Sequence, residues 1–318
     1  MKPIVIVGCT ATGKSALAEA LASHLNARLM AVDSMQVYRG MDIGTAKPDA
    51  ATRARLPYLM LDVADPWETY SAARFAADAA PHLEGVGRPI PDSRFPIPGQ
   101  PLILVAGTIL YLRALLEGLF AGPSADPAIR ARLESEAAAN SIQSLHARLV
   151  SIDPLAATRI HPNDLRRIIR ALEVFEITGQ PISTLQTQWH RDHPQMEATF
   201  IGIRRDKESL NRRINARVRS MFAAGLVDEV RRLSANPRGF SEEAASAVGY
   251  RQILDHFAGR CTLEDAAEQI KIQTRHLAKM QRTWLKRFPN VTWLDAAEDQ
   301  SGAELAAQTV AILSVPQS

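Results

Sequence analysis

The sequence of 318 residues is poor in cysteine, in aromatic residues and in long apolar runs. Cys9 and Cys261 are its only cysteines, which excludes a disulfide framework and favours a reducing compartment. The first three residues lead directly into a short apolar segment, too short for the core of a signal peptide. Arg113 interrupts the apolar stretch that begins at Leu102. We therefore expect a cytoplasmic protein without a membrane segment.

A large excess of one charge is also absent, since the formal net charge is only +3. The charges are unevenly placed, however: residues 201–290 hold 18 Lys and Arg against 10 Asp and Glu, a local net charge of +8. A basic half beside a slightly acidic half is typical of nucleic-acid-binding proteins and also of enzymes that bind small anions. Charge alone leaves both classes open.

A phosphate-binding P-loop is present near the N-terminus. A β-branched run at residues 4–7 precedes Gly8, four further residues and Gly13-Lys14-Ser15, and an Ala/Leu-rich helical segment follows. Glycines let backbone N–H groups surround an anion, the helix directs its positive end inward, and Lys14 adds a charge. The residues predicted to bind a di- or triphosphate are Gly8, Thr10, Ala11, Thr12, Gly13, Lys14 and Ser15. Ser15 is also the candidate ligand for Mg²⁺ carried by the phosphates.

The hydrophobic pattern predicts an α/β fold, a P-loop NTPase-like parallel sheet flanked by helices, with a helical insertion domain. In the first 120 residues a helix expected near 71–80, ending before Pro81, separates two of the strands. Five prolines make 89–101 a loop. Expected strands cover 4–7, 28–32, 58–63, 102–105 and 198–203. Expected domains are 1–122 (first part of the core), 123–195 (helical insertion) and 196–318 (return to the core and basic C-terminal helices).

The insertion is predicted to begin with Asp126 as a helix N-cap and Pro127 in the first turn. A second helix, over 163–178, ends at Gly179. Helices are also expected around 206–235, 243–257 and 262–287. The last of these carries a basic stripe with no acidic residue between its members, so that they repel one another unless an anion lies across them. A solvated helix face is the alternative. The stripe consists of Lys271, Arg275, Lys279, Arg282 and Lys286.

Asp33 follows the second expected strand and should lie beside the P-loop, because parallel strands present their C-terminal ends to the ligand. Its carboxylate could organise Mg²⁺ in a nucleotide-hydrolysing enzyme, or act as a base on a second substrate.

Five segments resemble the tRNA dimethylallyltransferases, also called tRNA isopentenyltransferases, in the order found in that family. They are GCTATGKS (8–15), VDSMQVYRGMDIGTAKP (32–48), AGTILY (106–111), VGYRQ (248–252) and TRHLAKMQRTW (274–284). The resemblance implies transfer of a dimethylallyl group from dimethylallyl diphosphate to the N6 amine of adenine 37 in tRNA. The P-loop would then hold a prenyl diphosphate, and Mg²⁺ would help to stabilise the leaving group.

The same resemblance implies that Asp33, Thr108 and Arg217 are the catalytic residues, with Asp33 accepting the proton of the amine. Arg213 is the alternative to Arg217 on the diphosphate, one turn away on the same helix face. The target adenine must leave its stack to be reached. The tRNA-binding residues implied are Asp33, Ser34, Met35, Gln36, Thr108, Arg130, Arg166, Arg167, Arg170, Ala247, Val248, Gly249, Tyr250, Arg251, Gln252, Arg275 and Lys279.

The sequence departs from the family at Ala106, where a glycine is usual, at Met280, where a basic residue is usual, and in the proline-rich 89–101. We expect a monomer whose partners are tRNA and dimethylallyl diphosphate. Without the resemblance, a small-molecule P-loop kinase is the first alternative, and an adenylate prenyltransferase that uses free nucleotide is the second. A non-catalytic RNA-binding protein is disfavoured by the intact P-loop and Asp33.

Overall fold

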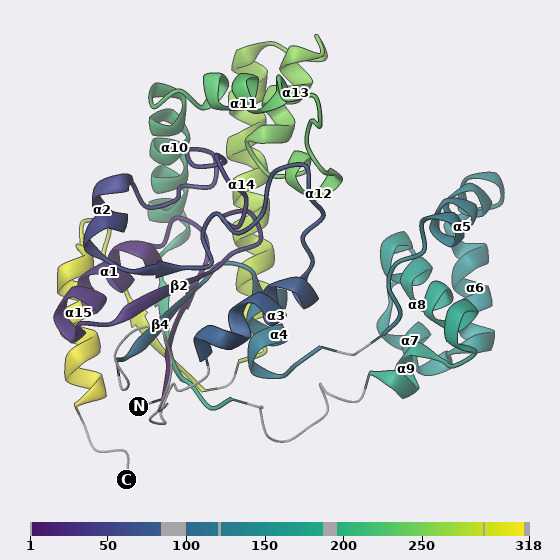
Figure 1. Cartoon of the computed structure of the whole chain (residues 1–318), viewed down its shortest axis with the longest axis horizontal. Helices are drawn as coiled ribbons and strands as arrows, with labels where there is room; N and C mark the ends of the chain where they lie inside the picture. The colour runs from purple at the N-terminus through teal and green to yellow at the C-terminus, as the bar shows by residue number, and fades with distance from the viewer. Residues whose placement is uncertain (1, 84–99, 120–121, 187–195, 289, 315–318) are drawn as a thin grey trace. The chain divides into compact units, whose positions relative to one another are not determined.

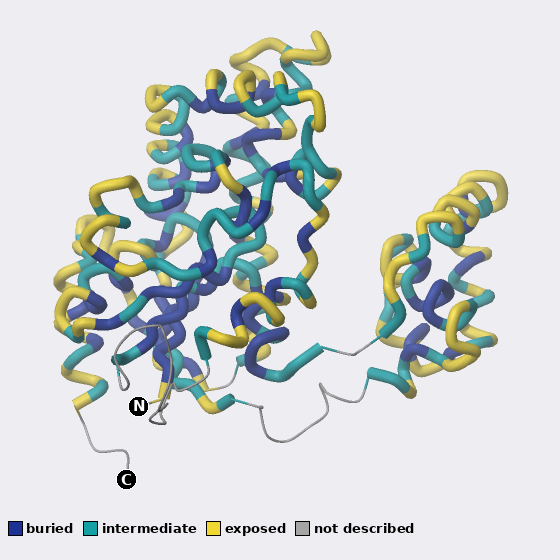
Figure 2. The backbone as a smooth tube through the Cα atoms, in the orientation of Figure 1, coloured by how far each residue is buried: buried dark blue, intermediate teal, exposed yellow. Residues whose placement is uncertain are grey.

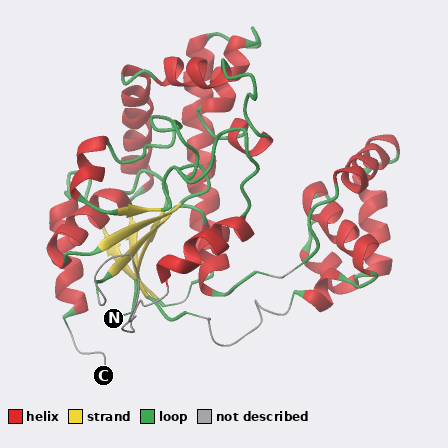
Figure 3. Cartoon of the chain, in the orientation of Figure 1, coloured by secondary structure: helices red, strands yellow, loops and turns green. Residues whose placement is uncertain are grey.

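A six-stranded parallel sheet forms the centre of the fold (Figures 1 and 3). The computed structural model describes residues 2–83, 100–119, 122–186, 196–288 and 290–314. The strand order is β3-β2-β4-β1-β5-β6, and every neighbouring pair is parallel. The predicted P-loop-type α/β fold class is thereby confirmed. The strands are β1 Ile4–Gly8, β2 Arg28–Val32, β3 Tyr58–Leu59, β4 Leu102–Ala106, β5 Thr199–Arg204 and β6 Val291–Asp295.

Helices cover both faces of the sheet. Alternate side chains of each strand point to opposite faces, so an apolar strand contributes to a core on each side. Ile4 and Ile6 belong to a core shared with helices α1 (Lys14–Leu25) and α15 (Gly302–Leu313). Val5 and Val7 belong to the core on the other face, shared with α3, α4 and α14. The bounds of these three helices are Ala72–Leu83, Ile109–Leu116 and Leu263–Leu285. The remaining helices of this unit are α2 Ala50–Arg55, α10 Lys207–Ala223, α11 Leu226–Ser234, α12 Glu242–Ala245 and α13 Tyr250–Phe257.

Residues Glu117–Gln195 form a second compact unit, while Met1–Leu116 and Met196–Ser318 make up the first. The second unit has a core of its own, which includes Leu145, Leu149 and Leu172 (Figure 2). Asp126 caps its first helix by accepting hydrogen bonds from two backbone N–H groups, as predicted, and Gly179 ends the fourth in a left-handed conformation. Its helices are α5 Pro127–Ala139, α6 Ile142–Ile152, α7 Pro154–Arg159, α8 Leu165–Thr178 and α9 Ile182–Leu185.

Two predicted elements differ in length from those observed. The strand expected over 58–63 contains only Tyr58 and Leu59, because Met60 (φ 64°) and Asp62 (φ 54°) turn the chain out of the extended conformation. The helix expected to end before Pro81 continues through it to Leu83. A proline in the last turn removes a single backbone hydrogen bond, which the end of a helix tolerates.

Strand β6 and helix α15 were not predicted from the sequence, and together they complete the sheet edge and one covering layer. Most of the proline-rich segment, residues 89–99, lies outside the described residues. In the part of the chain that the structure describes, no helix is both long and apolar enough to cross a membrane.

Candidate active site

The P-loop is a tight turn between β1 and α1. Gly8 (φ 154°) and Gly13 (φ 105°) have conformations that L-residues rarely adopt. A Cβ atom on Gly8 would lie 2.8 Å from Thr12 Oγ1 and 3.0 Å from the carbonyl oxygen of Ile203. Helix α1 begins at Lys14, where the loop ends. The N–H groups of its first turn have no partner within the helix and are available to an anion held by the loop. The loop therefore has the conformation that an anion-binding nest requires.

Basic side chains hold the carbonyl groups of this loop. Lys14 Nζ donates to Cys9 O (2.8 Å), Arg213 Nε donates to Ala11 O (2.9 Å) and Arg205 Nε donates to Thr12 O (2.8 Å). With their carbonyl groups engaged in this way, the peptide units of the loop are fixed in orientation. Both arginines belong to the basic segment 201–290, about two hundred residues from the loop in sequence.

Two cations of the site, Lys14 and Arg217, are half-buried. Desolvation and, to a smaller extent, the nearby Arg217 charge lower the pKa of Lys14 to about 8. Desolvation also lowers the pKa of Arg217, while the Asp33 carboxylate opposes this effect. Arg217 Nη1 lies 3.5 Å from Thr10 Oγ1 and its side chain lines the cavity, whereas the Arg213 side chain is engaged with the loop backbone. The geometry thus favours Arg217 over Arg213 as the arginine that faces a bound anion.

Asp33 begins the segment that follows β2. Its Oδ1 accepts hydrogen bonds from Met35 N (2.9 Å) and Gln36 N (3.3 Å), which closes a turn. Its Oδ2 is close to Gly107, where a Cβ atom would lie only 2.5 Å away. Thr108 Oγ1 accepts from Ser34 N at 2.9 Å and so holds the start of the same turn.

Gln36 is oriented by the 42–46 segment. Its Nε2 donates to Thr45 O (3.0 Å) and Ala46 O (3.4 Å). Because both partners are carbonyl groups, the nitrogen faces them, and Oε1 is the acceptor that points away. The structure thus leaves an acceptor oxygen on the other side of Gln36.

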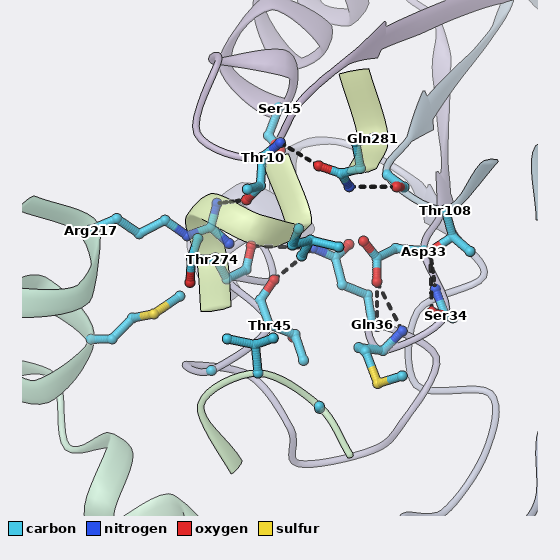
Figure 4. A pocket seen from close by; sticks show the side chains of 18 of the residues that line it. Thr10, Ser15, Asp33, Ser34, Gln36, Thr45, Thr108, Arg217, Thr274 and Gln281 are labelled. Atoms are coloured by element: carbon cyan, nitrogen blue, oxygen red, sulfur yellow. Dashed lines mark hydrogen bonds between the residues drawn. The ribbon is translucent and has the colours of Figure 1, made fainter. Parts of the chain in front are cut away.

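Gln281 of α14 joins the P-loop to the residues that follow β4 (Figure 4). Its Oε1 accepts from Thr10 N (2.7 Å), and its Nε2 donates to Gly107 O (2.7 Å). The surrounding cavity has a volume of about 310 Å³. It is lined by Thr10, Lys14, Ser15, Asp33, Ser34, Met35, Gln36, Gly44, Thr45, Ala46, Val105, Gly107, Thr108, Arg217, Val218, Met221, Ser246, Ala247, Val248, Ile270, Thr274, Leu277 and Gln281.

The cavity brings together all three predicted catalytic residues, Asp33, Thr108 and Arg217. Of the remaining residues predicted from the P-loop and the tRNA motifs, it also contains Thr10, Lys14, Ser15, Ser34, Met35, Gln36, Ala247 and Val248. Four other predicted residues of the P-loop do not line the cavity: Gly8, Ala11, Thr12 and Gly13. In the 247–252 segment, Gly249, Arg251 and Gln252 do not line it either. Tyr250 is completely buried, and its hydroxyl donates to Glu229.

The predicted tRNA-binding arginines of the second unit differ in their surroundings. Arg130 and Arg170 both pair with the buried carboxylate of Glu173, at 2.8 and 2.5 Å. The fully buried Glu173 therefore holds two arginines at the surface of its own unit. Arg166 and Arg167 are exposed, and Arg167 pairs with Asp164 at 2.9 Å.

The expectation that all five cations of the basic stripe are unpaired is wrong. Lys271 pairs with Glu268 (2.5 Å), one turn earlier on α14, and Arg275 Nη2 donates to Asn215 Oδ1 (2.6 Å) on α10. A single acidic residue three positions away was enough to partner a lysine on the helix surface. Lys279, Arg282 and Lys286 are exposed, and among the described residues no ion pair or side-chain hydrogen bond partners them.

Three residues that position the site were not singled out from the sequence: Arg205, Gln281 and Glu229. Gln281 lies inside the 274–284 motif, yet nothing local marks its contact with a loop 271 residues away. Glu229 carried a usable signal, because it shares the apolar face of α11 with Leu226 and Val230. A carboxylate on a buried helix face requires partners.

The fold and this cavity define a P-loop α/β enzyme with an anion site beside a carboxylate. The IPP transferase family model matches residues 36–288, and that of isopentenyl transferase matches residues 1–62. The chain belongs to the IPP transferase family. It is 43% identical over 294 residues to the tRNA dimethylallyltransferase of Geobacter metallireducens, covering 92% of each chain. It is 44% identical over 311 residues to that of Thiobacillus denitrificans, covering 98% of this chain and 96% of the relative.

Solved structures agree with this assignment. The full-length tRNA isopentenylpyrophosphate transferase from Bacillus halodurans is similar with a TM-score of 0.69 and 35% identity, over 98% of this chain and 95% of the other. A eukaryotic dimethylallyltransferase acting on tRNA has a TM-score of 0.78 and 28% identity, over 97% of this chain and 77% of the other.

Proposed function

We propose that the protein transfers a dimethylallyl group from dimethylallyl diphosphate to the N6 amine of adenine 37 in tRNA, releasing diphosphate. The observation that carries the proposal is the position of Asp33 in the same cavity as two half-buried cations, Lys14 and Arg217. Neither cation forms an ion pair among the residues that the structure describes, and cations partly removed from water favour an anionic ligand. The names of the relatives specify tRNA and a dimethylallyl group. The diphosphate donor and adenine 37 are part of the proposal.

In the proposed reaction the bond from N6 to the prenyl carbon forms while the bond from that carbon to the diphosphate oxygen breaks. The lone pair of N6 is delocalised into the purine ring, so the amine is a weak nucleophile until its proton is removed. Asp33 accepts this proton as general base. The negative charge that develops on the diphosphate oxygen is stabilised by the P-loop N–H groups, Lys14 and Arg217. Thr108 keeps the Asp33 turn in place through Ser34.

The residues present fit Mg²⁺ carried by the diphosphate. Mg²⁺ prefers oxygen ligands and takes one or two from the protein, with the rest from phosphate and water. Ser15 and Asp33 offer such oxygens in the cavity, and among the described residues no group of three or more His, Cys, Asp or Glu side chains is placed to hold a metal ion by itself. We infer that Ser15 holds the ion, which would supply charge neutralisation at the leaving group. We further propose that the enzyme acts as a monomer in the cytoplasm, a reducing compartment that suits a chain with two cysteines.

Incorporation of labelled dimethylallyl diphosphate tests the function. The acceptors are unmodified tRNA, the same tRNA with adenine 37 replaced, and free AMP, each with the wild-type protein and with Asp33→Ala. We expect label only in the tRNA that contains adenine 37, and a loss of about 10²- to 10⁴-fold in the variant. Label in AMP would instead identify a free-nucleotide prenyltransferase, and ATP turnover without transfer would identify a kinase.

A further inference from the structure

Glu229 is a buried carboxylate that has no part in the proposed chemistry. It is 3% exposed, and it accepts hydrogen bonds from three consecutive backbone N–H groups, those of Asp42 (3.0 Å), Ile43 (2.8 Å) and Gly44 (3.2 Å). The Tyr250 hydroxyl donates a fourth, at 2.5 Å. None of the donors that the structure describes is a basic side chain. An arc of successive N–H groups is an effective binding site for an anion, and here the protein supplies the anion itself.

Tyr250 also supports the same segment through its ring. The ring is completely buried against Gly44, so closely that a Cβ atom on Gly44 would lie 2.4 Å from it. Glu229 and Tyr250 come from α11 and from the first residue of α13. Two helices of the C-terminal half therefore fix a segment that belongs to the N-terminal half.

The segment held in this way forms one wall of the cavity. Gly44, Thr45 and Ala46 line it, and the carbonyl groups of Thr45 and Ala46 receive the Gln36 amide (Figure 4). Any rotation of the 42–46 segment would withdraw these carbonyl groups from Gln36. The direction of the Gln36 side chain thus depends on Glu229, which does not touch it.

We infer that Glu229 and Tyr250 are positioning residues for recognition of the acceptor base, an inference that rests on the proposed function. They orient Gln36 so that its Oε1 faces the cavity as a hydrogen-bond acceptor, beside the Asp33 carboxylate. An exocyclic amine has two protons. Asp33 removes one, and Gln36 Oε1 accepts a hydrogen bond from the other.

The experiment compares Glu229→Gln and Tyr250→Phe with wild type. Tyr58→Phe is the matched control, because the Tyr58 hydroxyl also donates to a carboxylate, Glu19 at 2.9 Å, away from the cavity. Binding of two anticodon stem-loop RNAs is measured, one with adenine and one with purine at position 37; purine lacks the N6 amine. Steady-state KM values for RNA and for dimethylallyl diphosphate, and the melting temperature, are measured alongside.

We expect wild type and Tyr58→Phe to bind the adenine RNA more tightly than the purine RNA, by about tenfold. Glu229→Gln should lose most of this preference and raise the KM for RNA about tenfold, with the KM for dimethylallyl diphosphate unchanged. Tyr250→Phe should lower the preference and raise the KM for RNA in the same direction, but by less. This variant provides the test if Glu229→Gln does not fold. An adenine preference equal in wild type and both variants would overturn the inference. So would an equal rise in both KM values with a lower melting temperature. Absence of transfer by the wild type would overturn the proposed function, while the comparison of the two RNAs would still test the positioning role.

Discussion

Asp33 and Gly107 are matched to each other at the level of single atoms. The carboxylate occupies the space that a side chain at position 107 would fill. The preceding residue, Ala106, is 1% exposed at the end of β4 and carries a methyl side chain. The fold therefore accommodates a side chain at position 106, whereas a side chain at position 107 would displace the Asp33 carboxylate.

Gly107→Ala should consequently lower activity in the same way as a substitution of Asp33, because it displaces the Asp33 carboxylate. The new methyl group must push the carboxylate aside, which is a small movement of one side chain, so stability should change little. We expect kcat to fall by about 10²-fold or more, the order of a general-base contribution. The measurement is the transfer rate together with the urea unfolding free energy. Ala106→Gly is the control, and it should retain wild-type kcat; unchanged kcat in Gly107→Ala would contradict this account of Asp33.

Because the pKa of Lys14 is lowered, we expect the affinity for dimethylallyl diphosphate to depend on pH. In the free protein Lys14 loses its proton near pH 8, whereas a bound diphosphate favours the protonated form and raises the pKa. Affinity for dimethylallyl diphosphate should therefore fall as pH rises above 8, and binding there should take up a proton. Calorimetry in two buffers of different ionisation enthalpy measures this uptake. Lys14→Met should bind weakly at all pH values and without this proton uptake; uptake that persists in the variant would assign the proton to another group.

The same pKa determines how the stability of the free protein depends on pH. Unfolding restores the ordinary value of 10.5, so between pH 8 and 10.5 the unfolded state binds more protons than the folded state. The contribution of Lys14 to the unfolding free energy therefore rises with pH across this interval. Burial of the charged amine is a cost that the folded protein bears below pH 8.

At the scale of elements, helix α14 serves two surfaces. One face lines the cavity with Ile270, Thr274, Leu277 and Gln281. The neighbouring stripe carries the exposed Lys279, Arg282 and Lys286, together with Lys271, which is paired. The exposed cations are the ones available to a phosphate backbone.

Lys279→Ala and Arg282→Ala should therefore weaken RNA binding, while Lys271→Ala should have little effect. Each phosphate contact that is lost should reduce the slope of log affinity against log salt by about 0.7 to 1. Binding of an anticodon stem-loop RNA at several salt concentrations measures both the affinity and the slope. If Lys271→Ala reduced the slope as much as Lys279→Ala, pairing with Glu268 would not distinguish the two lysines.

The sequence allowed some of these elements to be predicted better than others, for physical reasons. The P-loop and the Asp126 cap depend on residues within a few positions, so their patterns are local. Strand β3 was predicted too long because an apolar run does not reveal the left-handed conformation of Met60. Gln281 and Arg205 could not be found, since their partners in the P-loop lie 271 and 193 residues away. Only the fold decides such contacts.

At the scale of the whole molecule, the chain has two compact units with separate cores. Leu172→Ala removes a fully buried side chain from the core of residues 117–195. It should destabilise that unit by about 2 to 5 kcal/mol. Hydrogen exchange by mass spectrometry should show faster exchange in 117–195, with residues 1–116 and 196–318 little changed.

Binding of dimethylallyl diphosphate to Leu172→Ala should equal that of wild type, because every lining residue of the cavity belongs to the other unit. Leu21→Ala, in the core between the sheet and α1, is the reciprocal variant and should spare the exchange of 117–195. Faster exchange throughout the molecule in both variants would show that the two units unfold as one.

The distant fastening of the P-loop has a consequence for biosynthesis. The loop leaves the ribosome among the first residues. Its carbonyl groups cannot accept hydrogen bonds from Arg205 and Arg213 until those residues have been made, and Thr10 N cannot donate to Gln281 until still later. Strand β1 likewise lacks its neighbour β5 until residue 204 has been made. For most of translation the nascent chain therefore carries the P-loop sequence without the contacts that hold the loop in its folded conformation. A truncated product that ends before residue 205 would contain the whole signature and lack the arginines that hold it.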